Sequence, residues 1–135
     1  MNEVGPRRNG PLIEVRGLNK NFGSIPALAG VDLELAGGQV IGLLGENGCG
    51  KTTLLKVLAG VMQDHAGHVR IAGKRLGPET KACVSFLPDA SYLKDSATVS
   101  QCIGMFSDFF PDFRADKASD MIKFFGLAED MKLKQ

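Results

Sequence analysis

The sequence GENGCGKT, at residues 45–52, decides the fold of this chain. It fits the phosphate-binding pattern G-x-x-x-x-G-K-[ST]. Residues 39–44, just before it, are nearly all apolar, which predicts a buried parallel strand. Residues 52–59, just after it, predict a helix, because apolar side chains follow a helical spacing at Leu54, Val57 and Leu58 and again at Val61. Strand, glycine loop and helix thus occur in the order that the pattern requires, whereas an ordinary glycine-rich turn explains neither the lysine nor the threonine.

Each residue type in this loop suits a bound nucleoside triphosphate. Backbone N–H groups and peptide dipoles at the start of a helix attract phosphate oxygens, and glycines let the backbone curl around them. Lys51 adds a mobile positive charge for the β- and γ-phosphates, and the Thr52 hydroxyl is suited to ligate Mg²⁺. The predicted nucleotide-binding residues are Gly45, Glu46, Asn47, Gly48, Cys49, Gly50, Lys51, Thr52 and Thr53.

Composition and charge narrow the classes of protein to which the chain can belong. Its 135 residues allow one domain, and an apolar fraction of 44% is typical of globular proteins. Lysine and arginine number 16 against 15 acidic residues, which argues against nucleic acid as a partner. No apolar run reaches the length of a membrane span, and the first residues lack the apolar region of a signal peptide. We therefore expect any association with a membrane to come through a partner protein.

The three cysteines, Cys49, Cys83 and Cys102, are odd in number and have no C-x-x-C spacing. They predict neither a disulfide framework nor a zinc site, and they favour a reducing, cytosolic setting. Cys49 lies inside the phosphate loop, where we interpret it as a small residue at a variable position. The alternative is a thiol whose modification blocks nucleotide binding.

Apolar and alternating patterns predict strands on both sides of the loop. These strands are expected at residues 12–18, 27–35, 39–44, 68–72 and 82–87. Residues 19–26 are predicted to form a loop that carries Phe22, and residues 36–38 a hairpin turn. Residues 1–11 are expected to form a flexible tail. The chain therefore begins with antiparallel strands and leads the last of them into the phosphate loop.

Two helices are predicted in the C-terminal part of the chain. Thr98 and Gln101 have the spacing of a capping box, which opens a helix that reaches about Phe110. Residues 113–125 form a second predicted helix, with Gly126 as its C-cap signal. Six of the eight phenylalanines lie between residues 106 and 125. Most are expected in the core of this helical pair, and any exposed remainder would form a docking surface for an apolar partner.

Four motifs occur in order along the chain. They are Phe22 within NFG, GENGCGKTT followed by LLKVLAG, G-x-V-x-I-x-G at residues 67–73, and a segment that ends in FLP at residues 86–88. Together they resemble the nucleotide-binding domains of ATP-binding cassette (ABC) transporters over nearly the whole chain from Leu12. The resemblance implies an α/β P-loop NTPase fold with an antiparallel β subdomain, part of a parallel core sheet and a helical subdomain. Residues 12–90 would form the β subdomain and the P-loop core, and residues 91–135 the start of the helical subdomain.

The resemblance also implies roles for single residues. Phe22 would stack on the adenine of ATP, and Lys51 together with Mg²⁺ would stabilise the transferred phosphoryl group. Asp89 stands where the family usually has the glutamine that reaches Mg²⁺ and the attacking water. A carboxylate also binds Mg²⁺. The predicted catalytic residues are therefore Lys51 and Asp89, and the predicted metal ligands are Thr52 and Asp89. The competing interpretation is that Asp89 is only a turn residue after Pro88. The Pro-Asp pair itself resembles an exporter branch of the family that is associated with peptide antibiotics and lipid-directed compounds.

Several motifs that the family uses for hydrolysis do not occur in this sequence. They are the signature LSGGQ, an apolar strand that ends in Asp-Glu, and the histidine that follows them. The resemblance therefore implies a truncated domain, the first half to two-thirds of the whole. We expect the isolated chain to bind ATP with little or no turnover. We also expect uncovered apolar sheet edges to make it an oligomer or a strand-exchanged dimer.

The implied function is that of the ATP-binding subunit of a transporter. Its partners would be a transmembrane permease, contacted by the Asp89 loop and the phenylalanine-rich helices, and a second nucleotide-binding domain. It would lie in the cytoplasm, on the inner face of the cell membrane. The alternatives are a soluble cassette ATPase of translation or DNA repair, a small-molecule kinase, and a non-catalytic short form that senses nucleotide. The kinase is disfavoured because its acceptor-binding lid needs clustered arginines, which the sequence does not show at Arg70, Arg75 and Arg114.

Overall fold

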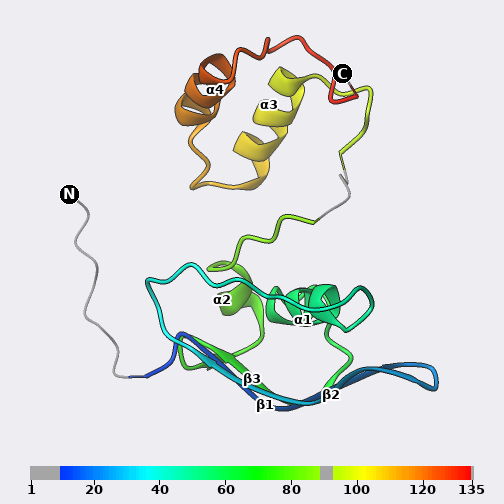
Figure 1. Cartoon of the computed structure of the whole chain (residues 1–135). Coiled ribbons are helices and arrows are strands. Elements are labelled where there is room, and N and C mark those ends of the chain that lie inside the picture. Colours follow the sequence, from blue (N-terminus) through cyan, green and yellow to red (C-terminus); the bar gives the residue numbers. More distant parts are fainter. Residues whose placement is uncertain (1–9, 89–92, 135) are drawn as a thin grey trace. The chain divides into compact units, whose positions relative to one another are not determined.

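The computed structural model describes residues 10–88 and 93–134, which form two compact units (Figure 1). The units divide between Leu87 and Pro88. The N-terminal unit contains β1 (Ile13–Phe22), β2 (Ile25–Leu35), α1 (Lys51–Leu58), β3 (Ala66–Ile71), β4 (Lys74–Arg75) and α2 (Pro78–Lys81). The C-terminal unit contains α3 (Val99–Phe109) and α4 (Ala115–Phe124).

The strands of the N-terminal unit form one antiparallel sheet in the order β2-β1-β3-β4. This confirms the antiparallel strands predicted before the loop. Both strands of the first hairpin are longer than predicted, so the predicted loop at residues 19–26 is reduced to a turn at Gly23 and Ser24. Pro26, which favoured a loop, fits within β2 because β2 lies at the edge of the sheet, where one side of its backbone pairs with no other strand among the described residues.

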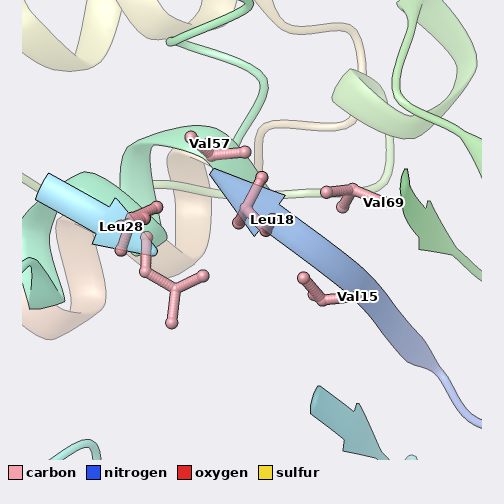
Figure 2. Close-up of a cluster of buried hydrophobic side chains, with 6 residues drawn as sticks. Val15, Leu18, Leu28, Val57 and Val69 are labelled. Atoms are coloured by element: carbon pink, nitrogen blue, oxygen red, sulfur yellow. The ribbon is translucent and has the colours of Figure 1, made fainter. Parts of the chain in front are cut away.

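The core of the N-terminal unit lies between the sheet and α1 (Figure 2). Its buried side chains come from β1, β2, α1 and β3, and are Val15, Leu18, Leu28, Leu54, Val57 and Val69. Val15 and Leu18 are three residues apart, so strict alternation would place them on opposite faces of the sheet. A register shift between them, with Gly17 at a φ of 55°, turns both into the core.

The segment that leads into the phosphate loop, residues 39–46, forms no strand. It is exposed throughout, and Val40 and Leu44 are almost completely so. The predicted buried strand at residues 39–44 and the hairpin turn at residues 36–38 are therefore wrong. A parallel strand is buried only when other strands pair with its edges and helices cover its faces. The strand pairing among the described residues is antiparallel and involves β1 to β4, so it offers this segment no neighbour.

The strand predicted at residues 82–87 is also wrong. Residues 82–83 form a turn after α2, a short helix that the sequence did not predict, and residues 84–88 have no regular structure. Pro78 stands at the first position of α2, and the Thr80 hydroxyl donates to the Gly77 carbonyl at 2.9 Å. Leu87 is almost completely exposed. This apolar segment, like residues 39–44, lacks a strand partner within the described part of the chain.

The capping signals of the C-terminal unit are confirmed. The Thr98 N–H donates to Gln101 Oε1 at 2.9 Å, and the Gln101 N–H donates to Thr98 Oγ1 at 3.3 Å. These reciprocal bonds are the predicted capping box at the start of α3. At the end of α4, the Gly126 N–H donates to the Lys123 carbonyl at 3.0 Å, so the helix ends where predicted. It begins at Ala115, slightly later than predicted.

The phenylalanines of the C-terminal unit are less buried than predicted. Phe106 stacks on Phe110 and Phe113, with ring centroids 5.8 and 5.6 Å apart. Four of the six rings are nevertheless more than half exposed, and they are Phe109, Phe110, Phe124 and Phe125. The expectation that most of the rings lie in a core is therefore wrong, because two helices of 11 and 10 residues bury only a narrow stripe against each other. These four rings are termed the exposed phenylalanines below.

Candidate functional site

The phosphate loop leads directly into α1, which begins at Lys51. Gly50 is the N-cap residue of the helix, with a φ of 93°, and no side chain caps the first N–H groups. These groups have no partner within a helix, so they can donate to an acceptor outside it. The first turn of α1 also contains no acidic residue that would repel an anion. The start of α1 therefore suits a phosphate group.

The loop is fixed to the first hairpin through Gly50. A Cβ atom at this position would lie 2.3 Å from the Ala27 carbonyl oxygen and 3.0 Å from Leu28 Cδ2. The loop backbone therefore packs directly on β2, with no room for a side chain. Leu28 and Leu54 belong to the same buried cluster, so the hairpin and the first turn of α1 share one core. This packing holds the start of the helix at a defined place on the sheet.

The Lys51 ammonium lies inside the loop. Its Nζ donates to the carbonyl oxygens of Gly45 and Glu46, each at 2.6 Å, and lies 3.7 Å from Cys49 Sγ. The Cys49 N–H donates to the Glu46 carbonyl at 3.3 Å, which closes a turn around the ammonium. Residues 45–49 are exposed. The loop thus holds a positive charge at its centre and stays open to solvent, as an incoming phosphate requires.

Thr52 is exposed in the first turn of α1, and Thr53 beside it is half-buried. In residues 10–88 and 93–134, no group of three or more His, Cys, Asp or Glu side chains could hold a metal ion. An accessible hydroxyl fits Mg²⁺ all the same, because proteins commonly hold this ion through few side chains together with substrate phosphates. Asp89, predicted as the second metal ligand and as a catalytic residue, lies outside the described residues.

Phe22 lies at the tip of the hairpin on which the phosphate loop is fixed. It is the last residue of β1, pairs with Ile25, and is 50% exposed. Ile25 and Ala27 are two residues apart on β2, so Phe22 lies about 7 Å along the strands from the contact made by Gly50. The structure therefore brings the predicted base-stacking ring and the predicted phosphate loop to one hairpin.

Sequence reasoning missed Lys20, whose ammonium lies over this ring, and Asp64, which pairs with that ammonium. Lys20 is only 8% exposed, and its Nζ donates to Asp64 Oδ2 at 2.8 Å. The same Nζ lies 5.2 Å from the centroid of the Phe22 ring. The hydrogen bond and the charge of Lys20 lower the pKa of the Asp64 carboxyl below its usual value. The sequence did contain a signal for the burial of Lys20, because the alternation of Leu18, Lys20 and Phe22 places the lysine on the core side of β1.

This chain is similar to proteins described as ATP-binding proteins of transporters. A family model described as ABC transporter matches residues 28–135. The ribose import ATP-binding protein RbsA of Cereibacter sphaeroides is 37% identical over 100 residues, which cover 70% of this chain and 20% of that protein. An uncharacterized ABC transporter ATP-binding protein of Methanocaldococcus jannaschii is 33% identical over 122 residues, which cover 90% of this chain and 36% of that protein.

A solved structure of the ATP binding subunit of an ABC transporter has the same fold over most of this chain. The two superpose with a TM-score of 0.73 at 25% identity, over 90% of this chain and 54% of the solved one. The chain therefore spans about half of that solved protein, and between 20% and 36% of the two curated relatives.

Proposed function

Because the chain belongs to the ABC transporter family, we propose that it binds ATP at residues 45–53, as part of the ATP-binding subunit of a membrane transporter. The match to the family model confirms the resemblance predicted from the motifs. The similarity to solved structures confirms the α/β P-loop fold with an antiparallel β subdomain. The exporter-like branch and the roles of single residues stay predictions.

The position of the Lys51 ammonium carries this proposal. It lies inside the loop, bonded to the Gly45 and Glu46 carbonyl oxygens, at the start of an uncapped helix. Phosphate oxygens of ATP would replace those carbonyls as partners of the ammonium and would accept from the first N–H groups of α1. The Thr52 hydroxyl would hold Mg²⁺, which neutralises charge on the β- and γ-phosphates when bound. Phe22 would stack on the adenine.

The proposal includes binding with little or no hydrolysis by this chain alone. Water attack on the γ-phosphate needs a residue that orients the water as well as a metal ion and a lysine. Lys51 supplies the lysine, and the Thr52 hydroxyl supplies one ligand for the metal ion. Among the described residues, no group of three or more His, Cys, Asp or Glu side chains could add a further metal site. Asp89, which lies outside the described residues, remains the proposed further metal ligand and a proposed catalytic residue of the whole ATP-binding subunit.

The proposed partners are a transmembrane permease and a second nucleotide-binding domain. The exposed phenylalanines support an apolar contact, because rings that remain in water are free to bind a partner. None of the helices in the described ranges has both the length and the apolar character to cross a bilayer. The proposed location is the cytoplasmic, inner face of the cell membrane, through the permease.

ATP binding by the purified chain tests the proposed function. We expect saturable binding in equilibrium dialysis with Mg²⁺, and competition by inorganic tripolyphosphate, because the loop contacts phosphates rather than the base. Adenosine, which has no phosphates, should compete far more weakly. A chain that binds neither ATP nor tripolyphosphate would overturn the proposed function.

Self-association of the isolated chain is a second expected result. The apolar segment at residues 40–44 exposes a backbone without strand partners among the described residues, together with Val40, Ile41, Leu43 and Leu44. Sedimentation velocity should show oligomers that grow with concentration. Val40→Ser combined with Leu44→Ser should shift the chain towards monomer, whereas Val61→Ser, at an exposed apolar residue elsewhere, should not. A monomer at every concentration would remove this prediction.

A further inference from the structure

Lys20 is a buried cation beside the predicted base-stacking ring. Its side chain lies on the core side of β1, on the same face as Leu18. Lysine is almost never fully buried unless its ammonium is paired. Here the ammonium lies 2.8 Å from the Asp64 carboxylate and 5.2 Å from the centroid of the Phe22 ring.

The ion pair alone does not explain the burial of this lysine. The Asp64 side chain is 99% exposed, and an ion pair with one fully solvated partner contributes little to stability. An apolar residue at position 20 would fill the same space without desolvating a charge. The contact that only a cation can make is the one with the face of the Phe22 ring.

We infer that Lys20 is a positioning residue for the nucleobase, which rests on the proposed nucleotide binding. The ammonium covers one side of the Phe22 ring, and the half-exposed ring keeps surface for adenine. Asp64 holds the ammonium in this place. Phe22 stands next to the turn at the hairpin tip, where an unsupported ring would have to be ordered when the base binds. Fixing it beforehand removes that entropy loss and strengthens stacking.

The position of Asp64 adds a link to the phosphate side of the site. Asp64 follows α1, the helix whose first residue is Lys51. Its bond to Lys20 therefore connects the segment after α1 to the strand that carries Phe22. One carboxylate thus ties the base side of the site to the helix that starts at the phosphate loop.

Lys20→Met tests this inference, because methionine keeps most of the aliphatic stem and removes the charge. We expect ATP affinity to fall about fivefold, the usual cost of ordering one side chain on binding, and tripolyphosphate affinity to stay unchanged. Lys20→Arg, which keeps a cation, should bind ATP within about twofold of the parent. In a Phe22→Leu background, Lys20→Met should have no further effect on ATP affinity. Lys74→Met, at an exposed lysine of β4, is the matched control and should change neither affinity.

Asp64→Ala supplies a second variant, because an exposed residue can be replaced even if Lys20→Met does not fold. It should weaken ATP binding by about three- to fivefold and leave tripolyphosphate binding unchanged. Equal losses for both ligands, in either variant, would show a merely structural role and overturn the inference. Unchanged ATP affinity in both variants would overturn it as well. A parent chain that binds tripolyphosphate but shows no preference for ATP would refute base positioning alone, whereas failure to bind either ligand would refute the proposed function.

Discussion

Lys51→Met is expected to weaken ATP binding by about 10- to 100-fold. A hydrogen bond to a charged group contributes roughly 1.5–3 kcal/mol, which corresponds to a loss of this size. The ammonium lies inside the loop, 2.6 Å from two of its carbonyl oxygens, where phosphate oxygens would meet it. Tripolyphosphate should lose as much affinity as ATP, because the lysine contacts only phosphates. Calorimetric titration at fixed Mg²⁺ and salt measures both ligands.

Lys56→Met is the matched control for this loss. Lys56 lies in the last turn of α1, so its replacement removes one positive charge from the same helix without touching the loop. We expect its ATP affinity to stay within about twofold of the parent, since a charge that far from the phosphates is largely screened. Equal affinities of the parent and Lys51→Met would show that the loop does not hold phosphate in this chain. Phosphate release that disappears in Lys51→Met would contradict the proposed lack of turnover.

The sequence predicted well those parts of the site that depend on neighbours within a few residues. The phosphate loop, the start of α1 and the capping box of α3 each follow from residue types at fixed short spacings. In each case the partner atoms belong to the same turn of chain, such as Lys51 Nζ and the Glu46 carbonyl oxygen. These features could therefore be predicted, because the groups that interact lie within a few residues of each other in the sequence.

The failures arise where burial depends on partners distant in sequence. Residues 39–44 have the apolar composition of a buried strand, but composition does not supply the strands that must pair with it. The exposed phenylalanines show the same limit, because periodicity predicts a stripe but not the width of the surface that covers it. Lys20 shows the reverse case. Alternation places it on the core side of β1, yet its charge argues for solvent until Asp64, 44 residues away, is known to pair with it.

Gly50→Ala is expected to lower the free energy of unfolding of the N-terminal unit by about 2–6 kcal/mol. An alanine held at a φ of 93° is strained by roughly 1–3 kcal/mol. Its Cβ atom would also lie 2.3 Å from the Ala27 carbonyl oxygen, and overpacking of this kind costs about 1–3 kcal/mol more. Urea unfolding followed by circular dichroism measures the sum.

Gly48→Ala separates the backbone strain from the collision with β2. Gly48 has a similar φ of 84°, but nothing lies within 4 Å of the Cβ atom that alanine would add. Its unfolding free energy should therefore fall by only about 1–3 kcal/mol. Equal losses at the two positions would mean that β2 gives way to the added methyl group, so that the loop is not anchored there. A larger loss at Gly50, accompanied by weaker ATP binding, would show that the hairpin itself holds the start of α1 in the position that a phosphate needs.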